Sequence, residues 1–249
     1  MSQSVAAAFA PLPFELVYSD GEPLETDWHT LELPLLRHLL RQAMAEQGRT
    51  DFFAGANIFV YYSVEQAREV AEEMSKGLPW RAFRGPDVFW VGGGIDSDRK
   101  REAWIAWEEG GRLPDVVFEM LSRSTAKKDR TTKKDLYARV FGTAEYFFYE
   151  PKTGKLEGFR LAGRFYQPIP PDENGRFWSE ELAASVGLWH GDVEGKEDDW
   201  VRLFRPDGSL IPTEAEAERE RAEAERWRAD EAEAELARLR ALLAERSRA

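Results

Sequence analysis

Two carboxylates stand in segments that otherwise read as apolar strands, and their types suit metal chemistry. Asp87 opens the run 87–91 directly after a proline, and Glu119 interrupts the run 116–121. A charged group is costly to bury unless a partner compensates it. A metal ion is one such partner, and an arginine or a backbone N–H group is another. Both interpretations are open for Glu119 taken alone.

A lysine in the following segment is the third residue that could take part in chemistry. The segment 131–141 carries apolar residues at helical spacing, namely Leu136, Tyr137, Val140 and Phe141. At about 100° per residue, Lys133 projects toward the centre of this apolar arc, whereas Lys134 points sideways. The stem of a lysine can be buried, but its ammonium group needs a carboxylate or a ligand. Lys133 is therefore predicted to meet an acidic group, or else to extend to the surface.

The composition limits the classes of function. The 249 residues are 43% hydrophobic, contain no cysteine and carry a formal net charge of −12. The absence of cysteine excludes disulfides, thiol nucleophiles and cysteine-ligated zinc, and it fits a reducing compartment. The sequence has no signal-peptide pattern and no long apolar run, so we expect a cytoplasmic protein that does not span a membrane. The acidity opposes long-range attraction to a polyanion.

The elements that must position these residues alternate between helices and short strands. A helix is predicted over 31–44, with Pro34 in its first turn, and another over 131–141. Strands are predicted over 57–62, 87–91, 115–121 and 145–149, and shorter ones over 156–161, 164–169 and 188–191. The pattern predicts a mixed α/β (α+β) fold with a central sheet, flanking helices and a late antiparallel β extension.

The last part of the chain, 213–249, is made almost wholly of Ala, Glu, Arg and Leu and predicts a helical tail after a domain over 1–212. Thr213 and Glu216 form a capping box at its start. A heptad stripe follows at Ala222, Ala229, Ala232, Leu236, Leu239 and Leu243. Because most of the stripe is alanine, a dimerising coiled coil and a solvated helix are equally compatible with it. A homodimer through the domain or through this helix is therefore one expectation.

Several segments together match one known family. They are Arg84-Gly85-Pro86-Asp87, Leu113-Pro114-Asp115-Val116-Val117-Phe118-Glu119-Met120-Leu121-Ser122, Asp129 with Lys133 and Tyr137 at four-residue steps, Glu145-Tyr146, Leu156-Glu157-Gly158-Phe159-Arg160-Leu161 and Trp178-Ser179-Glu180-Glu181-Leu182. With them the chain resembles the Uma-type family of restriction-endonuclease-like proteins, within the PD-(D/E)XK nuclease superfamily. The resemblance extends to about Pro212 and implies a restriction-endonuclease-like core.

The resemblance also implies roles for individual residues. Asp87 and Glu119 would supply the metal-binding carboxylates, and Lys133 would serve the attacking water. The superfamily lysine usually stands two residues after the second acid, but Leu121 occupies that position here, so the role passes to the helix. Two further acids are weaker candidates for the site, namely Glu32, one turn after His29, and Asp115.

The implied reaction is hydrolysis of phosphodiester bonds in DNA by an endonuclease. Oxygen ligands suit Mg²⁺, with Mn²⁺ as a substitute. The bases that would contact the nucleic-acid backbone are Arg123, Lys127, Lys128 and Arg130. The alternative is a non-catalytic nuclease-fold protein that binds nucleic acid or a protein partner, which the acidity and the missing strand lysine favour.

Overall fold

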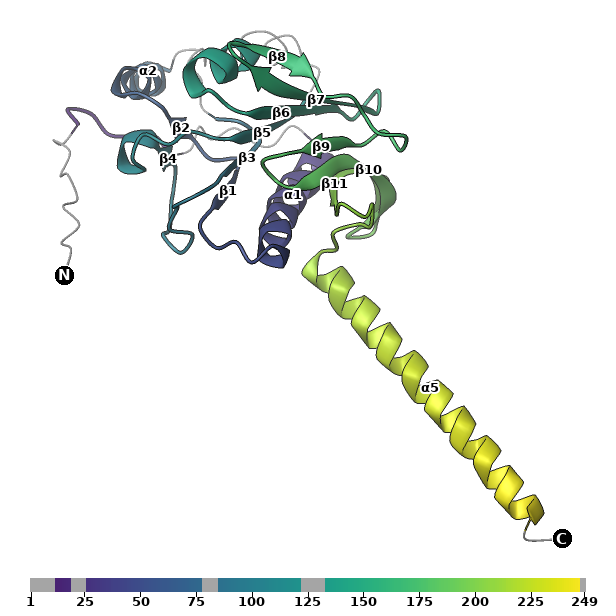
Figure 1. The fold of residues 1–249 in the computed structure, drawn as a ribbon. Helices are drawn as coiled ribbons and strands as arrows, with labels where there is room; N and C mark the ends of the chain where they lie inside the picture. The colour runs from purple at the N-terminus through teal and green to yellow at the C-terminus, as the bar shows by residue number, and fades with distance from the viewer. Residues whose placement is uncertain (1–11, 19–25, 78–84, 122–132, 247–249) are drawn as a thin grey trace.

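A six-stranded mixed sheet forms the centre of the molecule (Figure 1). The computed structural model describes residues 12–18, 26–77, 85–121 and 133–246. In spatial order the strands are β1 (Phe53–Ala56), β3 (Val88–Val91), β5 (Val116–Met120), β6 (Glu145–Glu150), β7 (Lys155–Ala162) and β8 (Phe165–Pro168). Only β5 and β6 run parallel among these neighbours, with a helical segment between them in sequence. The predicted mixed α/β class is confirmed.

The register of two antiparallel strands brings the candidate acids together. Val88 of β3 is paired with Phe118 of β5. Because the strands run in opposite directions, the residue before β3 lies beside the residue after Phe118. Asp87 and Glu119 occupy these two positions, and the alternation of side chains along each strand places both on the same face of the sheet.

One face of the sheet is covered by the first helix and a second sheet. The helix α1 (Asp27–Glu46) contacts β1, β3 and β11. The second sheet has the order β11 (Lys196–Phe204), β10 (Ala184–Val193) and β9 (Phe177–Ser179). The rings of Trp28 and Trp200 stack with centroids 5.9 Å apart, and they join α1 to β11 within a core that also contains Phe118 and Met120.

The opposite face carries smaller elements and the candidate acids. They are β2 (Val60–Tyr61), α2 (Val64–Ser75), β4 (Trp104–Ile105), η1 (Ala106–Glu108), α4 (Lys134–Leu136) and the π-helix η3 (Tyr137–Phe141). A second hydrophobic cluster on this face includes Phe89, Val117 and Tyr137. The two clusters use alternate residues of β3 and β5, as a sheet covered on both sides requires.

Two predictions about element boundaries were wrong, and the predicted late β extension has two parts. The strand expected over 57–62 is shortened to β2, and Asn57, with a left-handed φ of 49°, lies between β2 and the strand β1, which was not predicted. The first helix begins at Asp27, so Pro34 lies in its interior rather than in its first turn. The late β extension is divided, since β7 and β8 join the main sheet while β9, β10 and β11 form their own.

The helix predicted over 131–141 is present in its described part, but it is not a regular α-helix. The π-helical stretch η3 follows α4 and ends at Gly142, whose φ is 67°. A π-turn contains more residues than an α-turn, which changes the direction of the side chains that follow it. Val140 is consequently 50% exposed, although regular spacing predicted it in the apolar arc.

The C-terminal helix α5 (Glu214–Arg246) projects away from the sheets (Figure 1). Its predicted capping box is confirmed: the Thr213 N–H donates to Glu216 Oε2 at 2.7 Å, and the Glu216 N–H donates to Thr213 Oγ1 at 3.2 Å. Glu216 also pairs with Arg202 of β11, at 2.6 and 3.0 Å. Trp227 and Leu236 are exposed. No helix in the described part of the chain combines the length and apolarity needed to cross a membrane.

Candidate active site

Asp87 is held at the start of β3 by backbone contacts on both sides. Its Oδ2 accepts a hydrogen bond of 2.6 Å from the backbone N–H of Met120, at the end of β5. Its own carbonyl oxygen accepts from the Asn57 N–H at 2.9 Å. The strand order thus fixes the carboxylate against the neighbouring strand, next to Glu119.

Glu119 is the more enclosed acid of the pair that it forms with Asp87. Its side chain is 1% exposed and lies on the face of the sheet that carries Tyr137 and Val117. The adjacent strand residues, Phe118 and Met120, point into the opposite core. A carboxylate at such a position requires polar partners, because desolvation without compensation is unfavourable.

The described partners of Glu119 come from the helical segment that contains Lys133 and Tyr137. The ammonium Nζ of Lys133 lies 2.8 Å from Glu119 Oε2, and the hydroxyl of Tyr137 donates to Glu119 Oε1. Lys133 and Tyr137 are four residues apart, so they share one face of the helix. The Lys133 side chain is 17% exposed. Lys133 therefore reaches inward, in the direction that helical phase predicts.

Tyr137 is a member of this cluster that the sequence analysis placed in the apolar arc and in the family motif but gave no role in the site. Burial raises the pKa of its hydroxyl well above the ordinary value, and the charge of Glu119 and the hydrogen bond to it act in the same direction. The charge of Asp87 adds to the effect. The hydroxyl hence stays protonated and acts as a donor. Its position one turn after Lys133 was the signal that could have identified it.

Lys134 takes a different direction from Lys133. Its Nζ lies 3.2 Å from the centroid of the Phe159 ring on β7. Partial burial lowers the pKa of this ammonium, and the charge of Glu157 opposes that shift. Adjacent lysines thus occupy separate environments, one against an acid and the other against an aromatic ring.

His29 approaches the site from the other side of the sheet. This residue of α1 is buried, and its Nε2 lies 3.4 Å from the Met120 carbonyl oxygen. Its Nδ1 lies 2.7 Å from the Thr26 hydroxyl, which caps the helix. The contact joins the start of α1 to the end of β5, next to the acid pair. The sequence analysis named His29 only as the residue one turn before Glu32.

The structure places the two additional candidate acids away from Lys133. Asp115 precedes β5, at the end of the strand opposite to Glu119. Its Oδ2 accepts from the Gly92 N–H at 2.8 Å and lies 3.4 Å from Arg112. Four residues of strand, about 13 Å, separate it from Glu119. Asp115 is therefore not brought together with the acid pair.

Glu32 lies on the α1 side of the sheet. Its Oε2 accepts from the Val201 N–H at 3.3 Å, and its Oε1 has no hydrogen-bond partner within the described residues. Burial raises the pKa of this carboxyl well above the ordinary value, while the Val201 hydrogen bond and the charge of Arg202 lower it. These contacts join α1 to β11 rather than to the acid pair.

The predicted nucleic-acid contacts fall outside the described residues. These are Arg123, Lys127, Lys128 and Arg130. The described part of the chain also contains no group of three or more histidine, aspartate or glutamate side chains arranged to hold a metal ion. The acid pair by itself offers two carboxylates, so a bound ion would complete its coordination with water, backbone or substrate oxygens.

A mixed sheet with neighbouring acids on two strands, and a helix lysine bonded to the second acid, has the arrangement of the restriction-endonuclease-like class. The family model described as "Uma2: Putative restriction endonuclease" matches residues 13–194, which is well over half of the chain. The chain therefore belongs to the Uma2 family. The matched range contains Asp87, Glu119 and Lys133 and ends just before β11.

Solved structures with a similar fold include one nuclease-like protein. The crystal structure of a "putative nuclease belonging to DUF820" from Anabaena variabilis is similar at 12% sequence identity, with a TM-score of 0.41. The match covers 67% of this chain and 82% of that chain. No curated protein matches the sequence.

Proposed function

We propose that this protein is a divalent-metal-dependent endonuclease that hydrolyses phosphodiester bonds in DNA. The proposed catalytic core is Asp87, Glu119 and Lys133. The observation that carries the proposal is the enclosed Glu119 carboxylate, bonded to the ammonium of Lys133 and lying beside the anchored Asp87. Membership of the Uma2 family supports the same class of reaction.

The donor chemistry of the acid pair fits Mg²⁺ or Mn²⁺. Asp87 and Glu119 offer hard carboxylate oxygens, which both ions accept. Among the described residues, the two acids contribute two negative charges and Lys133 one positive charge, a balance that suits a divalent cation. When bound, such an ion would lower the pKa of a coordinated water and stabilise negative charge on the phosphoryl group.

The proposed role of Lys133 is to orient the attacking water and to add positive potential. An ammonium has three N–H donors, so the bond to Glu119 leaves it able to donate to a water or a phosphate oxygen as well. Tyr137 is proposed as a positioning residue, because its protonated hydroxyl holds the other oxygen of Glu119. Fixed donors of this kind contribute to catalysis without reorganising during the reaction.

Plasmid nicking in the presence of Mg²⁺ or Mn²⁺ tests the proposal, with Lys134→Ala as the matched control for Lys133→Ala. We expect Lys133→Ala to lower the rate by about 10²-fold or more and Lys134→Ala to change it little. Glu119→Gln keeps the shape and removes the charge, and it should be inactive. Equal rates in the two lysine variants, or wild-type cleavage by Glu119→Gln, would contradict the proposal.

Calorimetric titration with Mg²⁺ tests the metal separately. Asp87→Asn is the suitable variant, because its amide oxygen can still accept from the Met120 N–H while the charge is lost. Wild type should bind the ion, and the variant should bind it about tenfold more weakly or worse. No binding by wild type, or equal binding by both proteins, would remove the metal from the mechanism.

A second candidate function is a nuclease-fold protein that binds nucleic acid or a protein partner without cleaving DNA. It is favoured by the fact that both oxygens of Glu119 already have partners in Lys133 and Tyr137, and by the net charge of −12. In that case the acid and lysine would stabilise the fold alone. Binding of DNA without metal-dependent cleavage would select this function.

A further inference from the structure

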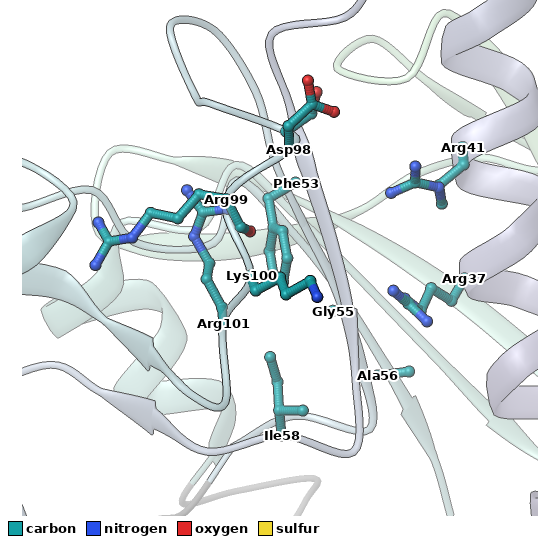
Figure 2. A pocket seen from close by; sticks show the side chains of 11 residues that line it. Arg37, Arg41, Phe53, Gly55, Ala56, Ile58, Asp98, Arg99, Lys100 and Arg101 are labelled. Atoms are coloured by element: carbon teal, nitrogen blue, oxygen red, sulfur yellow. The ribbon is translucent and has the colours of Figure 1, made fainter.

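A cavity of about 430 Å³ opens at the β1 edge of the six-stranded sheet (Figure 2). Phe53 and Ala56 of β1 lie at its base together with Ile58, α1 forms one wall, and residues 97–101 form the other. The cavity is separate from the acid pair and takes no part in the contacts described for it.

Three cations face this cavity. Figure 2 shows Arg37 and Arg41 extending from α1 toward the opposite wall, and Lys100 extending toward α1. Arg37 and Arg41 are four residues apart and so share one face of the helix. Arg37 donates from Nε to the Ala54 carbonyl oxygen at 3.1 Å. Within the described residues, none of the three forms an ion pair, and all three are exposed.

The other two cations of the lining are engaged in structural pairs. Arg101 donates to both oxygens of Glu109, at 2.8 and 3.0 Å, and its side chain is buried. Arg99 lies 2.6 Å from Glu108 and 3.1 Å from Glu109. The carboxylate of Asp98 points away from the cavity in Figure 2. The uncompensated positive charge therefore belongs to Arg37, Arg41 and Lys100, in a protein whose net charge is −12.

The base of the cavity adjoins the backbone that carries the first acid. Ala56 and Ile58 flank Asn57, whose N–H donates to the Asp87 carbonyl oxygen at 2.9 Å. The backbones are close here, since a Cβ added at Gly85 would lie 2.4 Å from the Ile58 carbonyl oxygen. The cavity and the acid pair thus lie on adjacent strands at the same end of the sheet.

The helix α1 extends from the acid pair toward the cavity, so its length relates the two sites. His29 at the start of α1 lies against the Met120 carbonyl at the acid pair. Arg37 and Arg41 follow it by eight and twelve residues, which is about 12 and 18 Å along a helix. Successive phosphates of one B-DNA strand rise by about 3.4 Å. These distances along α1 correspond to about four to five base-pair rises of B-DNA.

We propose that this cavity binds backbone phosphates of the DNA substrate, with Arg37, Arg41 and Lys100 as the contacts. The inference rests on the proposed function and adds a second place where the substrate is held. Guanidinium groups bind phosphate through paired N–H donors. Contacts of this kind position the duplex without reading its sequence.

Fluorescence anisotropy with a labelled 24-base-pair duplex, in EDTA and over a series of salt concentrations, tests the inference. The variants are Arg41→Ala and Arg41→Ala/Lys100→Ala. Arg164→Ala is the matched control, because this exposed arginine lies in the β7–β8 turn at the other edge of the sheet. Each lost phosphate contact should reduce the slope of log affinity against log salt by about 0.9. The slope should therefore fall by about 1.8 in the double variant and stay unchanged in the control.

A wild-type slope and affinity in the double variant would overturn the inference. Displacement of the duplex by an equal concentration of a mononucleotide would also overturn it, since the cavity would then be a site for a small anion. Measuring metal-dependent nicking with the same proteins distinguishes a failure of the cavity proposal from a failure of the proposed function. A wild type that binds but does not cleave would refute the nuclease proposal alone, whereas an unchanged double variant of a cleaving enzyme would refute the cavity proposal alone.

Discussion

Replacing Lys133 with alanine should destabilise the protein as well as inactivate it. The Glu119 side chain is 1% exposed and Lys133 is 17% exposed, with 2.8 Å between Oε2 and Nζ. Removing one member of a buried ion pair leaves the other charge uncompensated in a medium that solvates it poorly, at a cost of about 3–5 kcal/mol. Since 1 kcal/mol corresponds to about 2–4 °C in a domain of this size, the melting temperature should fall by about 6–20 °C.

Urea denaturation followed by tryptophan fluorescence measures this effect, because the chain has nine tryptophans. The control is Lys134→Ala, which removes a cation from the Phe159 ring and should cost about 0.5–1 kcal/mol. Adding Glu119→Gln to Lys133→Ala removes the uncompensated charge, so the double variant should be more stable than Lys133→Ala alone.

The effect of Mg²⁺ on the stability of Lys133→Ala provides a second test of the same reasoning. Mg²⁺ should stabilise Lys133→Ala, because a bound cation would compensate the carboxylate that the ammonium no longer meets. A loss below about 1 kcal/mol in Lys133→Ala, or a double variant less stable than the single one, would refute the reasoning that Lys133 compensates a buried charge.

Three further outcomes follow from the contacts. Tyr137→Phe removes a hydroxyl donor from the buried carboxylate, so nicking should slow by about 10-fold to 100-fold while the fold is retained in circular dichroism. Burial raises the pKa of Glu32 above its value of 4.5 in the unfolded chain, so the native state keeps a proton that the unfolded state loses. The free energy of unfolding should then decline above pH 4.5 by at most about 1.4 kcal/mol per pH unit. Urea denaturation at a series of pH values should show a shallower decline of the unfolding free energy in Glu32→Gln. The same decline in the variant and in wild type would exclude this carboxyl as the cause. Truncation after Pro212 deletes Glu216, the ion-pair partner of buried Arg202, and should lower the free energy of unfolding by about 3–5 kcal/mol in urea denaturation. Truncation two helical turns further on keeps the Arg202–Glu216 pair and should lower it little.

The acid pair could be predicted because its signals are local. A carboxylate that interrupts an apolar strand is visible in the sequence around Glu119, and the proline before Asp87 marks a strand entry. The inward direction of Lys133 followed from helical phase over a few residues. The same phase was wrong at Val140, because a π-turn intervenes and nothing in the apolar spacing indicates one.

Features that depend on long-range packing could not be predicted from the local sequence. Periodicity could place Glu32 on a helix, but the residue that faces it comes from β11, 169 positions later. Asp115 precedes β5 and Glu119 lies near its other end, and the contacts of Asp115 with Gly92 and Arg112 come from segments that the local sequence does not place beside it. The cavity cations were also missed, because Arg37 and Lys100 come from distant segments that meet only at the sheet edge.

The position of the lysine has a physical explanation in the two faces of the sheet. Leu121 points to the same face as Glu119, since the two are two positions apart and side chains alternate along a strand. It packs in the cluster that contains Tyr137 and Phe89. A helix that crosses this face can place its own cation against the acid, so the strand position is released for apolar packing. The proposed mechanism requires an ammonium at the Glu119 carboxylate, and either a strand or the crossing helix can supply it.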